Sequence, residues 1–415
     1  MNKELLRLVT IGSVDDGKST LIGRLLFDSG SVYEDQVESV TRASKERGFE
    51  SLDFSLFTDG LAAEQEKRIT IDVAYRYFET ERRKFILADC PGHFEYTRNM
   101  FTGSSTANVA LILIDAQEGI QEQTKRHAYI ASLLQVSHLV LCVNKMDKAN
   151  YDQKVFDNIV ESFREFSSKL DINDIHFIPM SALCGDGVVT RSANMPWYDG
   201  PTLSYLLDNI HISGDGNNID ARFPIQMVFT QNDRNMILGR VASGSLRKGD
   251  EVMVLPSGIT SRILEISLAK SQLNEASVGM SVAIELEDDI QVMRGDMLVR
   301  INNRPQVGTQ FDVMMCWLDD QPFDRQKSYL IRQTSKETKA AVSEVIYKVD
   351  IHSLSRMQDT KEVVANDIIR ARIITQDPVC FDTYRNNKST GSIILIDPET
   401  NNTVAAGMIH SYVDR

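Results

Sequence analysis

The sequence predicts an α/β domain, with a mostly parallel sheet flanked by helices, followed by two small all-β barrel domains. From residue 1 to about 211, apolar strand-like runs alternate with segments of helix length. The segment SGDGNN, residues 213–218, has the composition of a flexible linker. Beyond it, helix periodicity gives way to short β-rich runs separated by Gly and Asp turns. We therefore expect three domains, which comprise residues 1–211, 220–301 and 302–415.

The first domain is predicted from its alternation of strands and helices. Strands are expected over residues 5–11, near 71–78, and over 84–88, 109–114, 139–143 and 175–179. Helices are expected over residues 19–27, 121–134 and 152–170. A long polar insertion, residues 29–68, follows the first helix and has helix-like patches around 34–47 and 61–67. An insertion of this length is usually functional or mobile.

The two β domains are predicted from closely spaced turns. In residues 220–301, the segments VASG, KGD and RGD separate short strands such as residues 251–255. This spacing predicts a small closed barrel. In residues 302–415, strands over 311–317, 368–374 and 392–396 predict a second β domain.

A glycine-containing loop, GSVDDGKST, follows the first strand and precedes the first helix, which is the layout of a phosphate-binding P-loop. Gly12 and Gly17 let the backbone come close to phosphate oxygens, which loop amides and the helix N-terminus then meet. Lys18 supplies a point charge, and the Ser19 hydroxyl can coordinate Mg²⁺. The predicted phosphate-binding residues are Gly12, Ser13, Val14, Asp15, Asp16, Gly17, Lys18, Ser19 and Thr20. Asp15 and Asp16 add negative charge beside the phosphate site, which is tolerable if the backbone faces inward and both side chains face out.

A second motif follows the strand predicted over residues 84–88. Its predicted nucleotide-binding residues are Asp89, Cys90, Pro91, Gly92 and His93. Asp89, at the carboxyl end of the strand, can hold the Mg²⁺ shell, while the Gly92 amide meets the γ-phosphate. His93 is expected to position the attacking water. The other histidines are expected to be surface or packing residues, and they are His127, His138, His176, His211, His352 and His410.

Two further motifs select the base. NKMD, residues 144–147, offers the Asn144 amide to a purine edge and the Asp147 carboxylate to the N1 and N2 hydrogens of guanine. SAL, residues 181–183, can place backbone amides on the guanine oxygen. The residues predicted to form the base site are Asn144, Lys145, Met146, Asp147, Ser181, Ala182 and Leu183. Four motifs in this order, each after a strand, predict a P-loop domain that binds GTP.

Thr70, in the segment KRITID, ends the long insertion just before a strand. Its hydroxyl can bind Mg²⁺ and sense the γ-phosphate, so residues 29–70 are predicted to be a switch. The predicted catalytic residues are Lys18, Thr70 and His93, and the predicted metal ligands are Ser19, Thr70 and Asp89.

Composition excludes several classes of protein. The net charge of −13 argues against a broad nucleic-acid surface. The five cysteines are scattered without a CxxC pair, so neither a disulfide framework nor a zinc site is indicated. No apolar run approaches the length of a membrane span, and the N-terminus enters the first strand without a cleavable signal. We expect a cytoplasmic protein.

With its two β domains, this set of motifs resembles the translation-factor GTPases (elongation factor Tu/1-alpha-like) across essentially the whole chain. Residues 12–29, 69–78 and 390–409 are most similar to the family of GTPase subunits (the large subunit 1) of bacterial sulfate adenylyltransferases. Elongation factors typically have His or Ser where this chain has Asp16. The family usually has Gly where this chain has Arg68.

The resemblance implies a heterodimer, or a higher assembly of heterodimers, that uses GTP and Mg²⁺. A smaller partner subunit would bind ATP and sulfate and form adenosine 5′-phosphosulfate and pyrophosphate, driven by GTP hydrolysis on this chain. The single P-loop agrees with this division, and residues 220–415 lack the P-loop of the kinase fused to some relatives. The alternatives are an elongation factor that carries aminoacyl-tRNA and a regulatory GTPase without coupled chemistry. The net charge and Asp16 favour the first function, and we expect neither nucleic acid nor membrane as a partner.

Overall fold

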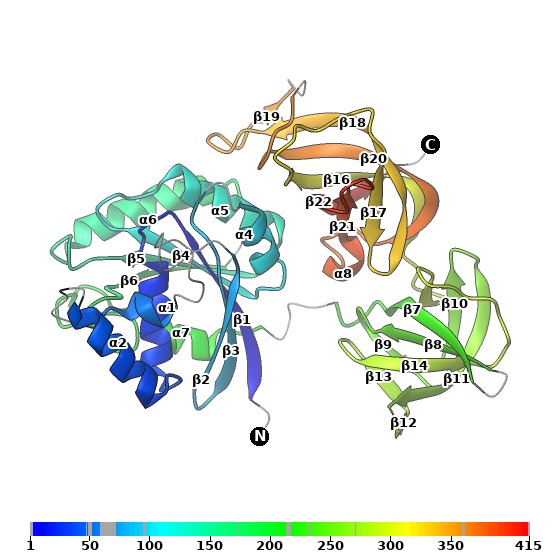
Figure 1. Cartoon of the computed structure of the whole chain (residues 1–415), viewed down its shortest axis with the longest axis horizontal. Coiled ribbons are helices and arrows are strands. Elements are labelled where there is room, and N and C mark those ends of the chain that lie inside the picture. Colours follow the sequence, from blue (N-terminus) through cyan, green and yellow to red (C-terminus); the bar gives the residue numbers. More distant parts are fainter. Residues whose placement is uncertain are drawn as a thin grey trace. The chain divides into compact units, whose positions relative to one another are not determined.

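The computed structural model describes residues 3–46, 48, 52–58, 72–93, 97–172, 174–212, 217–231, 234–269, 271–358 and 362–413. The chain forms two compact units (Figure 1). The first unit comprises Met1–Asp215 with Ile351–Leu354, and the second comprises Gly216–Asp350 with Ser355–Arg415.

The first unit is built on a six-stranded sheet with the order β2-β3-β1-β4-β5-β6. Its strands are β1 Glu4–Gly12, β2 Ala74–Glu79, β3 Arg83–Asp89, β4 Val109–Asp115, β5 His138–Asn144 and β6 Asp174–Pro179. All neighbouring strands run parallel except β2, which pairs antiparallel with β3. Every residue of β4 is buried, as expected for a parallel sheet covered on both faces. The predicted α/β fold class is confirmed.

Helices cover both faces of this sheet, with α1 and α7 on one face and α4, α5 and α6 on the other (Figure 1). Their bounds are α1 Lys18–Asp28, α2 Glu34–Glu46, α4 Thr97–Ser104, α5 Glu122–Leu133, α6 Gln153–Ser167 and α7 Leu203–Asn209, with a short 3₁₀ helix, η1, over Phe54–Phe57. The predicted helical patch at residues 34–47 corresponds to α2, and the patch at 61–67 lies outside the described residues.

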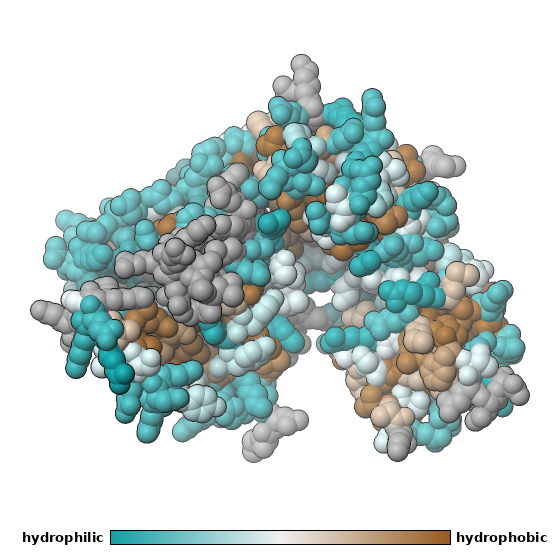
Figure 2. Space-filling view, viewed as in Figure 1, coloured by the Kyte–Doolittle hydropathy of each residue, from teal (hydrophilic) through white to brown (hydrophobic). Residues whose placement is uncertain are grey.

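Helix α6 shows why these segments pack as they do. Phe156, Ile159, Phe163 and Phe166 are buried at the spacing of one helix face. The carboxylate of Asp152 caps the helix by accepting from the amide of Lys154. The surface over α5 and α6 is mainly hydrophilic (Figure 2). In the described part of the chain, no helix is both long and apolar enough to cross a membrane.

The second unit holds two closed barrels, which confirms the predicted pair of barrel domains. In the first, β10 pairs with both β15 and β11 and so closes the order β10-β15-β7-β8-β14-β11. In the second, β17 pairs with both β21 and β18 and closes the order β17-β21-β22-β16-β20-β18. The elements of the first are β7 Arg222–Gln231, β8 Arg234–Arg240, β9 Ser245–Arg247, β10 Glu251–Leu255, β11 Ile259–Leu268, β12 Ser271–Leu273, β13 Glu275–Ser277, β14 Ser281–Leu286 and β15 Met297–Arg300. Those of the second are β16 Gln306–Trp317, β17 Tyr329–Gln333, β18 Lys336–Val349, β19 Arg356–Met357, β20 Ile368–Phe381, α8 Lys388–Gly391, β21 Ser392–Ile396 and β22 Thr403–Tyr412.

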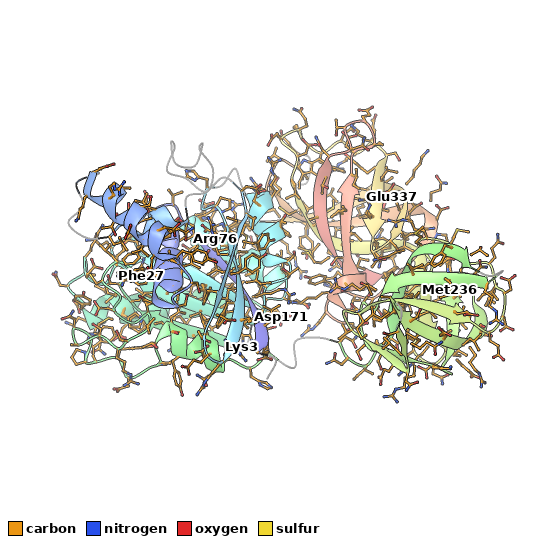
Figure 3. The ribbon with its side chains drawn as sticks, turned by 60° about the horizontal axis from the view of Figure 1, so that its bottom comes forward. Lys3, Phe27, Arg76, Asp171, Met236 and Glu337 are labelled. Atoms are coloured by element: carbon orange, nitrogen blue, oxygen red, sulfur yellow. The ribbon has the colours of Figure 1, made fainter. Side chains whose placement is uncertain are left out.

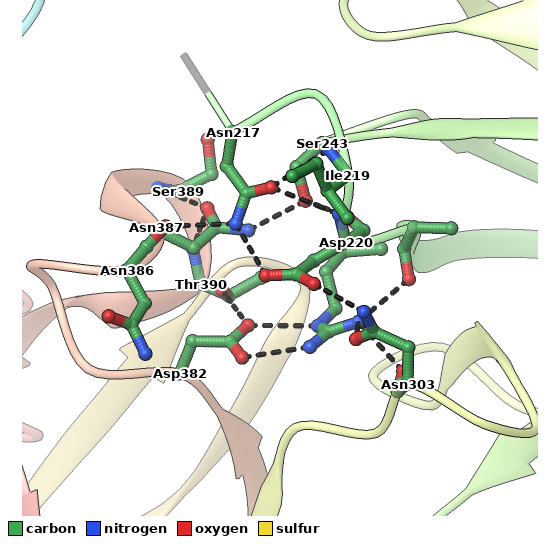
Figure 4. A network of polar contacts seen from close by, with 12 residues as sticks. Asn217, Ile219, Asp220, Ser243, Asn303, Asp382, Asn386, Asn387, Ser389 and Thr390 are labelled. Atoms are coloured by element: carbon green, nitrogen blue, oxygen red, sulfur yellow. Dashed lines mark hydrogen bonds and ion pairs between the residues drawn. The ribbon is translucent and has the colours of Figure 1, made fainter. Parts of the chain in front are cut away.

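A buried polar network joins the two barrels (Figure 4). The Arg222 guanidinium donates from Nε and Nη2 to the two carboxylate oxygens of Asp382, at 2.9 Å each. The Thr390 hydroxyl donates to the same carboxylate, and Asn387 Nδ2 donates to the Ser243 hydroxyl at 2.7 Å. A buried ion pair is tolerated when its geometry is bidentate and its remaining lone pairs are satisfied. The network therefore links the start of β7 firmly to the segment that follows β20.

Candidate nucleotide site

The four motifs of the first domain meet at one edge of its sheet. Strand register pairs Thr10 with Asp89, Asp115 with Asn144, and Val143 with Pro179. The loops that follow β1, β3, β5 and β6 therefore leave the same edge, because parallel strands place their carboxyl ends together.

The P-loop has a backbone that only small residues permit. Gly12 and Gly17 have φ values of 149° and 91°, and Asp15 lies in the left-handed region at 64°. A Cβ on Gly12 would lie 2.7 Å from the Leu113 carbonyl oxygen, and a Cβ on Gly17 would collide with the Asn144 amide. Glycine is therefore needed at both positions, because the loop backbone packs directly against the end of β4 and against Asn144.

Lys18 is buried at the first position of α1. Its Nζ donates to the carbonyl oxygens of Gly12 and Ser13, at 3.2 and 2.6 Å. Burial lowers the pKa of this ammonium, although the carboxylates of Asp16 and Asp89 oppose the shift. A Cβ on Gly92 would collide with Nζ, so the backbone after β3 comes close to the ammonium. An anion bound at this point would meet a cation that is already desolvated.

Asp16 differs from our expectation. Asp15 is exposed, as predicted, but Asp16 is only 3% exposed and its Oδ2 accepts from the Ser13 amide at 2.6 Å. Burial raises the pKa of Asp16 to about 6, although Lys18 lowers it. The outward direction predicted for this side chain is therefore wrong, because the carboxylate satisfies an amide of the loop itself.

Asn144 joins two of the loops. Its Nδ2 donates to the Asp16 carbonyl at 2.8 Å, and its Oδ1 accepts from the Ala182 amide at 2.9 Å. The second hydrogen on Nδ2 leaves the predicted purine contact possible, and that contact stays a prediction. Lys145 extends from the same turn and pairs with Asp115 at 2.8 Å.

Asp147 has an unsatisfied acceptor. Its Oδ1 is buried and accepts no hydrogen bond from the described part of the chain. A buried acceptor without a donor costs free energy, so this atom indicates a ligand that brings hydrogen-bond donors. The neighbouring Met146 amide donates to the Met180 carbonyl at 3.1 Å, which fixes the turn against the start of the 181–183 loop. Ser181 is buried there and accepts from the Cys184 amide, whereas Leu183 is 48% exposed.

The residues after β3 lie beside the P-loop. Asp89 is buried, and its Oδ1 accepts from the Thr10 hydroxyl at 3.3 Å. Cys90, Pro91 and Gly92 are buried after it. His93 is half-buried and lines, with Val14 and Asp115, a cavity of about 630 Å³ beside the loop. Ser19 and Thr20 are half-buried in the first turn of α1. Thr70 and Arg68 lie outside the described residues.

Sequence reasoning missed the role of His127. This histidine is fully buried on α5, and its Nδ1 accepts from the Gly12 amide at 3.1 Å. Burial, assisted by Lys18, lowers the pKa of His127 to about 3, so the ring is neutral and Nε2 carries its hydrogen. The Gln123 amide lies 2.8 Å from Nε2, which requires its oxygen to face the ring. The spacing of Gln123 and His127 on one helix face was the only signal of this arrangement in the sequence.

The pKa of Asp16 predicts a pH-dependent stability. The folded value of about 6 exceeds the unfolded value of 3.8, so stability is lost as pH rises through this range. Asp16→Asn keeps an acceptor for the Ser13 amide but cannot ionise. The free energy of unfolding of this variant minus that of the wild type should increase by about 2 kcal/mol between pH 4 and pH 8. Denaturant titrations of nucleotide-free protein measure this difference, and a difference that does not change with pH would contradict the assignment.

Family models match most of the chain. The model "Elongation factor Tu GTP binding domain" matches residues 3–228. "Elongation factor Tu domain 4" matches residues 222–299, and "GTP-eEF1A C-terminal domain-like" matches residues 310–410. The first domain is therefore a GTP binding domain of the elongation factor Tu type.

Individual proteins are similar over nearly the whole chain. "Sulfate adenylyltransferase subunit 1" of Bacteroides thetaiotaomicron is 49% identical over 423 residues, which cover 99% of this chain and 87% of that protein. "Bifunctional enzyme CysN/CysC" of Mycobacterium tuberculosis is 49% identical over 411 residues, 98% of this chain and 67% of that protein. A solved structure of Sup35 complexed with GDP matches with 24% identity and a TM-score of 0.46, over 100% of this chain and 95% of that one. With 49% identity and this coverage, the resemblance found in the sequence is confirmed, and the chain belongs to the family of sulfate adenylyltransferase subunit 1.

Proposed function

We propose that this chain hydrolyses GTP to drive the synthesis of adenosine 5′-phosphosulfate and pyrophosphate from ATP and sulfate on a smaller partner subunit. The structural observation that carries the guanine-nucleotide part of the proposal is the buried Oδ1 of Asp147, which accepts no hydrogen bond from the described residues and lies at the edge that also holds the P-loop. The identity of 49% to a sulfate adenylyltransferase subunit supports this function over the carriage of aminoacyl-tRNA. The name "subunit 1" supports the existence of a partner chain.

The nucleotide lies with its phosphates in the P-loop and its base between Asp147 and the 181–183 loop. The amides of residues 14–20 and the Lys18 ammonium bind the β- and γ-phosphates. The Asp147 carboxylate accepts from N1 and N2 of guanine, a donor pair that adenine does not have. Oδ1 of Asp147 is buried and accepts no hydrogen bond within the described ranges, which supports this role, because the two guanine donors would satisfy the carboxylate.

The donor set also suits Mg²⁺. The Ser19 hydroxyl on α1 and the buried Asp89 carboxylate after β3 are the oxygen ligands that this ion prefers. We assign Thr70 as a further ligand on the strength of its position in the sequence. When bound there, Mg²⁺ neutralises charge on the β- and γ-phosphates.

Hydrolysis needs a positioned water more than a strong base. His93, directly after Gly92, holds this water in line with the γ-phosphate, whose oxygens the Gly92 amide and Lys18 stabilise. The water oxygen bonds to the γ-phosphorus as the bond to the bridging oxygen breaks, and GDP and inorganic phosphate are released. Loss of the γ-phosphate would remove the contact through which Thr70 senses the nucleotide.

A coupled assay tests the function. The full chain is mixed with its smaller subunit, ATP and sulfate, and pyrophosphate release is measured with and without GTP. We expect GTP to raise the rate and yield of pyrophosphate, with phosphate released from GTP in parallel. Lys18→Ala should reduce GTP turnover on the order of 100-fold and abolish the stimulation. Pyrophosphate release that is indifferent to GTP, together with tight binding of aminoacyl-tRNA, would overturn the proposal.

Asp147→Asn tests the base assignment. An amide in place of the carboxylate loses the charged pair with N1 and N2 of guanine but can donate to the C2 oxygen of xanthine. We expect the Kd for GTP to rise roughly 10- to 150-fold and the preference to shift toward XTP. Equilibrium titration with both nucleotides measures the shift. If the variant keeps the wild-type preference for GTP, Asp147 does not read the base.

A further inference from the structure

Arg24, on α1 six residues after Lys18, contacts two different parts of the first unit, the 181–183 loop and η1. Its Nε donates to the Ala182 carbonyl at 3.1 Å, and its Nη2 donates to the Leu183 carbonyl. The carbon of its guanidinium lies 3.9 Å from the centre of the Phe54 ring. The side chain is only 15% exposed. Its hydrogen bond to Ala182 is partly buried, whereas its bond to Leu183 lies at the surface.

The hydrogen bond to Ala182 fixes the direction of an amide in the base loop. A carbonyl and the following N–H belong to one planar trans peptide and point in opposite directions. Because Arg24 holds the Ala182 carbonyl, the Leu183 N–H points away from α1. The Ala182 N–H already donates to Asn144, and the Cys184 N–H donates to the Ser181 hydroxyl. Arg24 thus sets the direction of the amide at Leu183.

Through the contact between Arg24 and Phe54, residues 52–58 of the long insertion pack against α1. The Phe54 ring also meets the Phe27 ring edge-on at 5.6 Å. A Cβ on Gly23 would overlap the Phe54 carbonyl oxygen, so η1 approaches α1 as closely as a glycine allows. At the other end, Arg76 of β2, labelled with Phe27 in Figure 3, donates to the Thr58 carbonyl. Residues 52–58 are therefore held from both sides.

We propose that Arg24 is a positioning residue that couples guanine recognition to the seating of residues 52–58. It aims the Leu183 amide at the guanine O6 oxygen and presents one guanidinium face to the Phe54 ring. The idea rests on the proposed function, because it assigns a base contact within the same site. The planar guanidinium group can donate to two adjacent carbonyls and stack on a ring at the same time. A lysine ammonium cannot do both, so lysine is a poor substitute. Gly185 leaves room for the guanidinium group, since a Cβ on Gly185 would lie 3.3 Å from Nη1 of Arg24.

The central variant is Arg24→Met, which keeps the length and apolar stem of the side chain but has no donors. We expect it to weaken GDP and IDP binding by the same factor, about tenfold. Hypoxanthine keeps the O6 oxygen but lacks the 2-amino group, so the ratio of the two Kd values should not change. In Asp147→Asn, by contrast, that ratio should change. Arg24→Lys should restore part of the affinity, and Arg42→Met, at an exposed arginine of α2, is the matched control.

The coupling is tested by Phe54→Leu, which keeps apolar bulk but removes the ring. We expect Phe54→Leu to raise the Kd for GDP several-fold. In the double variant Arg24→Met/Phe54→Leu, the Kd should rise by less than the product of the two single fold-changes. Thermal unfolding shows whether each variant is folded. If the folded Arg24→Met variant has wild-type Kd values, or if it loses affinity for GDP but not for IDP, Arg24 does not position the amide that contacts O6. Wild-type affinity in Phe54→Leu, or independent losses in the double variant, would overturn the coupling. A wild-type chain that binds no guanine nucleotide would instead refute the proposed function.

Discussion

The nucleotide site depends on one buried amide, the side chain of Asn144. It ends β5, is 2% exposed, and bonds to residues 128 positions before it and 38 positions after it in the chain. Through these bonds the P-loop and the base loop keep a fixed separation, which the length of a nucleotide requires. Removing the amide would leave the Asp16 carbonyl and the Ala182 N–H without partners, at a cost of about 1–3 kcal/mol for each buried group. The amide therefore holds the site together before any ligand is bound.

Electrostatics complete the site around this amide. Lys18 is a buried cation whose acceptors are carbonyl oxygens, and burial lowers its pKa. Asp16 is a buried carboxyl whose pKa burial raises, and His127 is kept neutral next to the same loop. The phosphates of a nucleotide would supply the negative charge that Lys18 lacks among its hydrogen-bond partners. At the base end of the site, Oδ1 of Asp147 is buried without a hydrogen-bond donor in the described part of the chain, so it needs donors from a ligand.

The sequence predicted the sheet and the meeting of the four motifs, since both follow from hydrophobic patterning and from loops placed after parallel strands. It did not predict the direction of the Asp16 side chain, because an aspartate in a tight loop can face either way until a neighbouring amide selects one. The sequence also did not predict the contacts of His127 and Arg24, since each side chain bonds to a loop that follows another strand. Thr70 remains a prediction from the sequence, because it lies outside the described residues.

The central claim is that four loops at one sheet edge form a site selective for guanine. Calorimetric titration of the full chain with GDP and with ADP tests it most directly, because both ligands offer the same phosphates to the P-loop. The account predicts one GDP bound per chain and an affinity for ADP at least a hundredfold weaker, since adenine has no donor pair for Asp147. Equal affinity for the two nucleotides would contradict it.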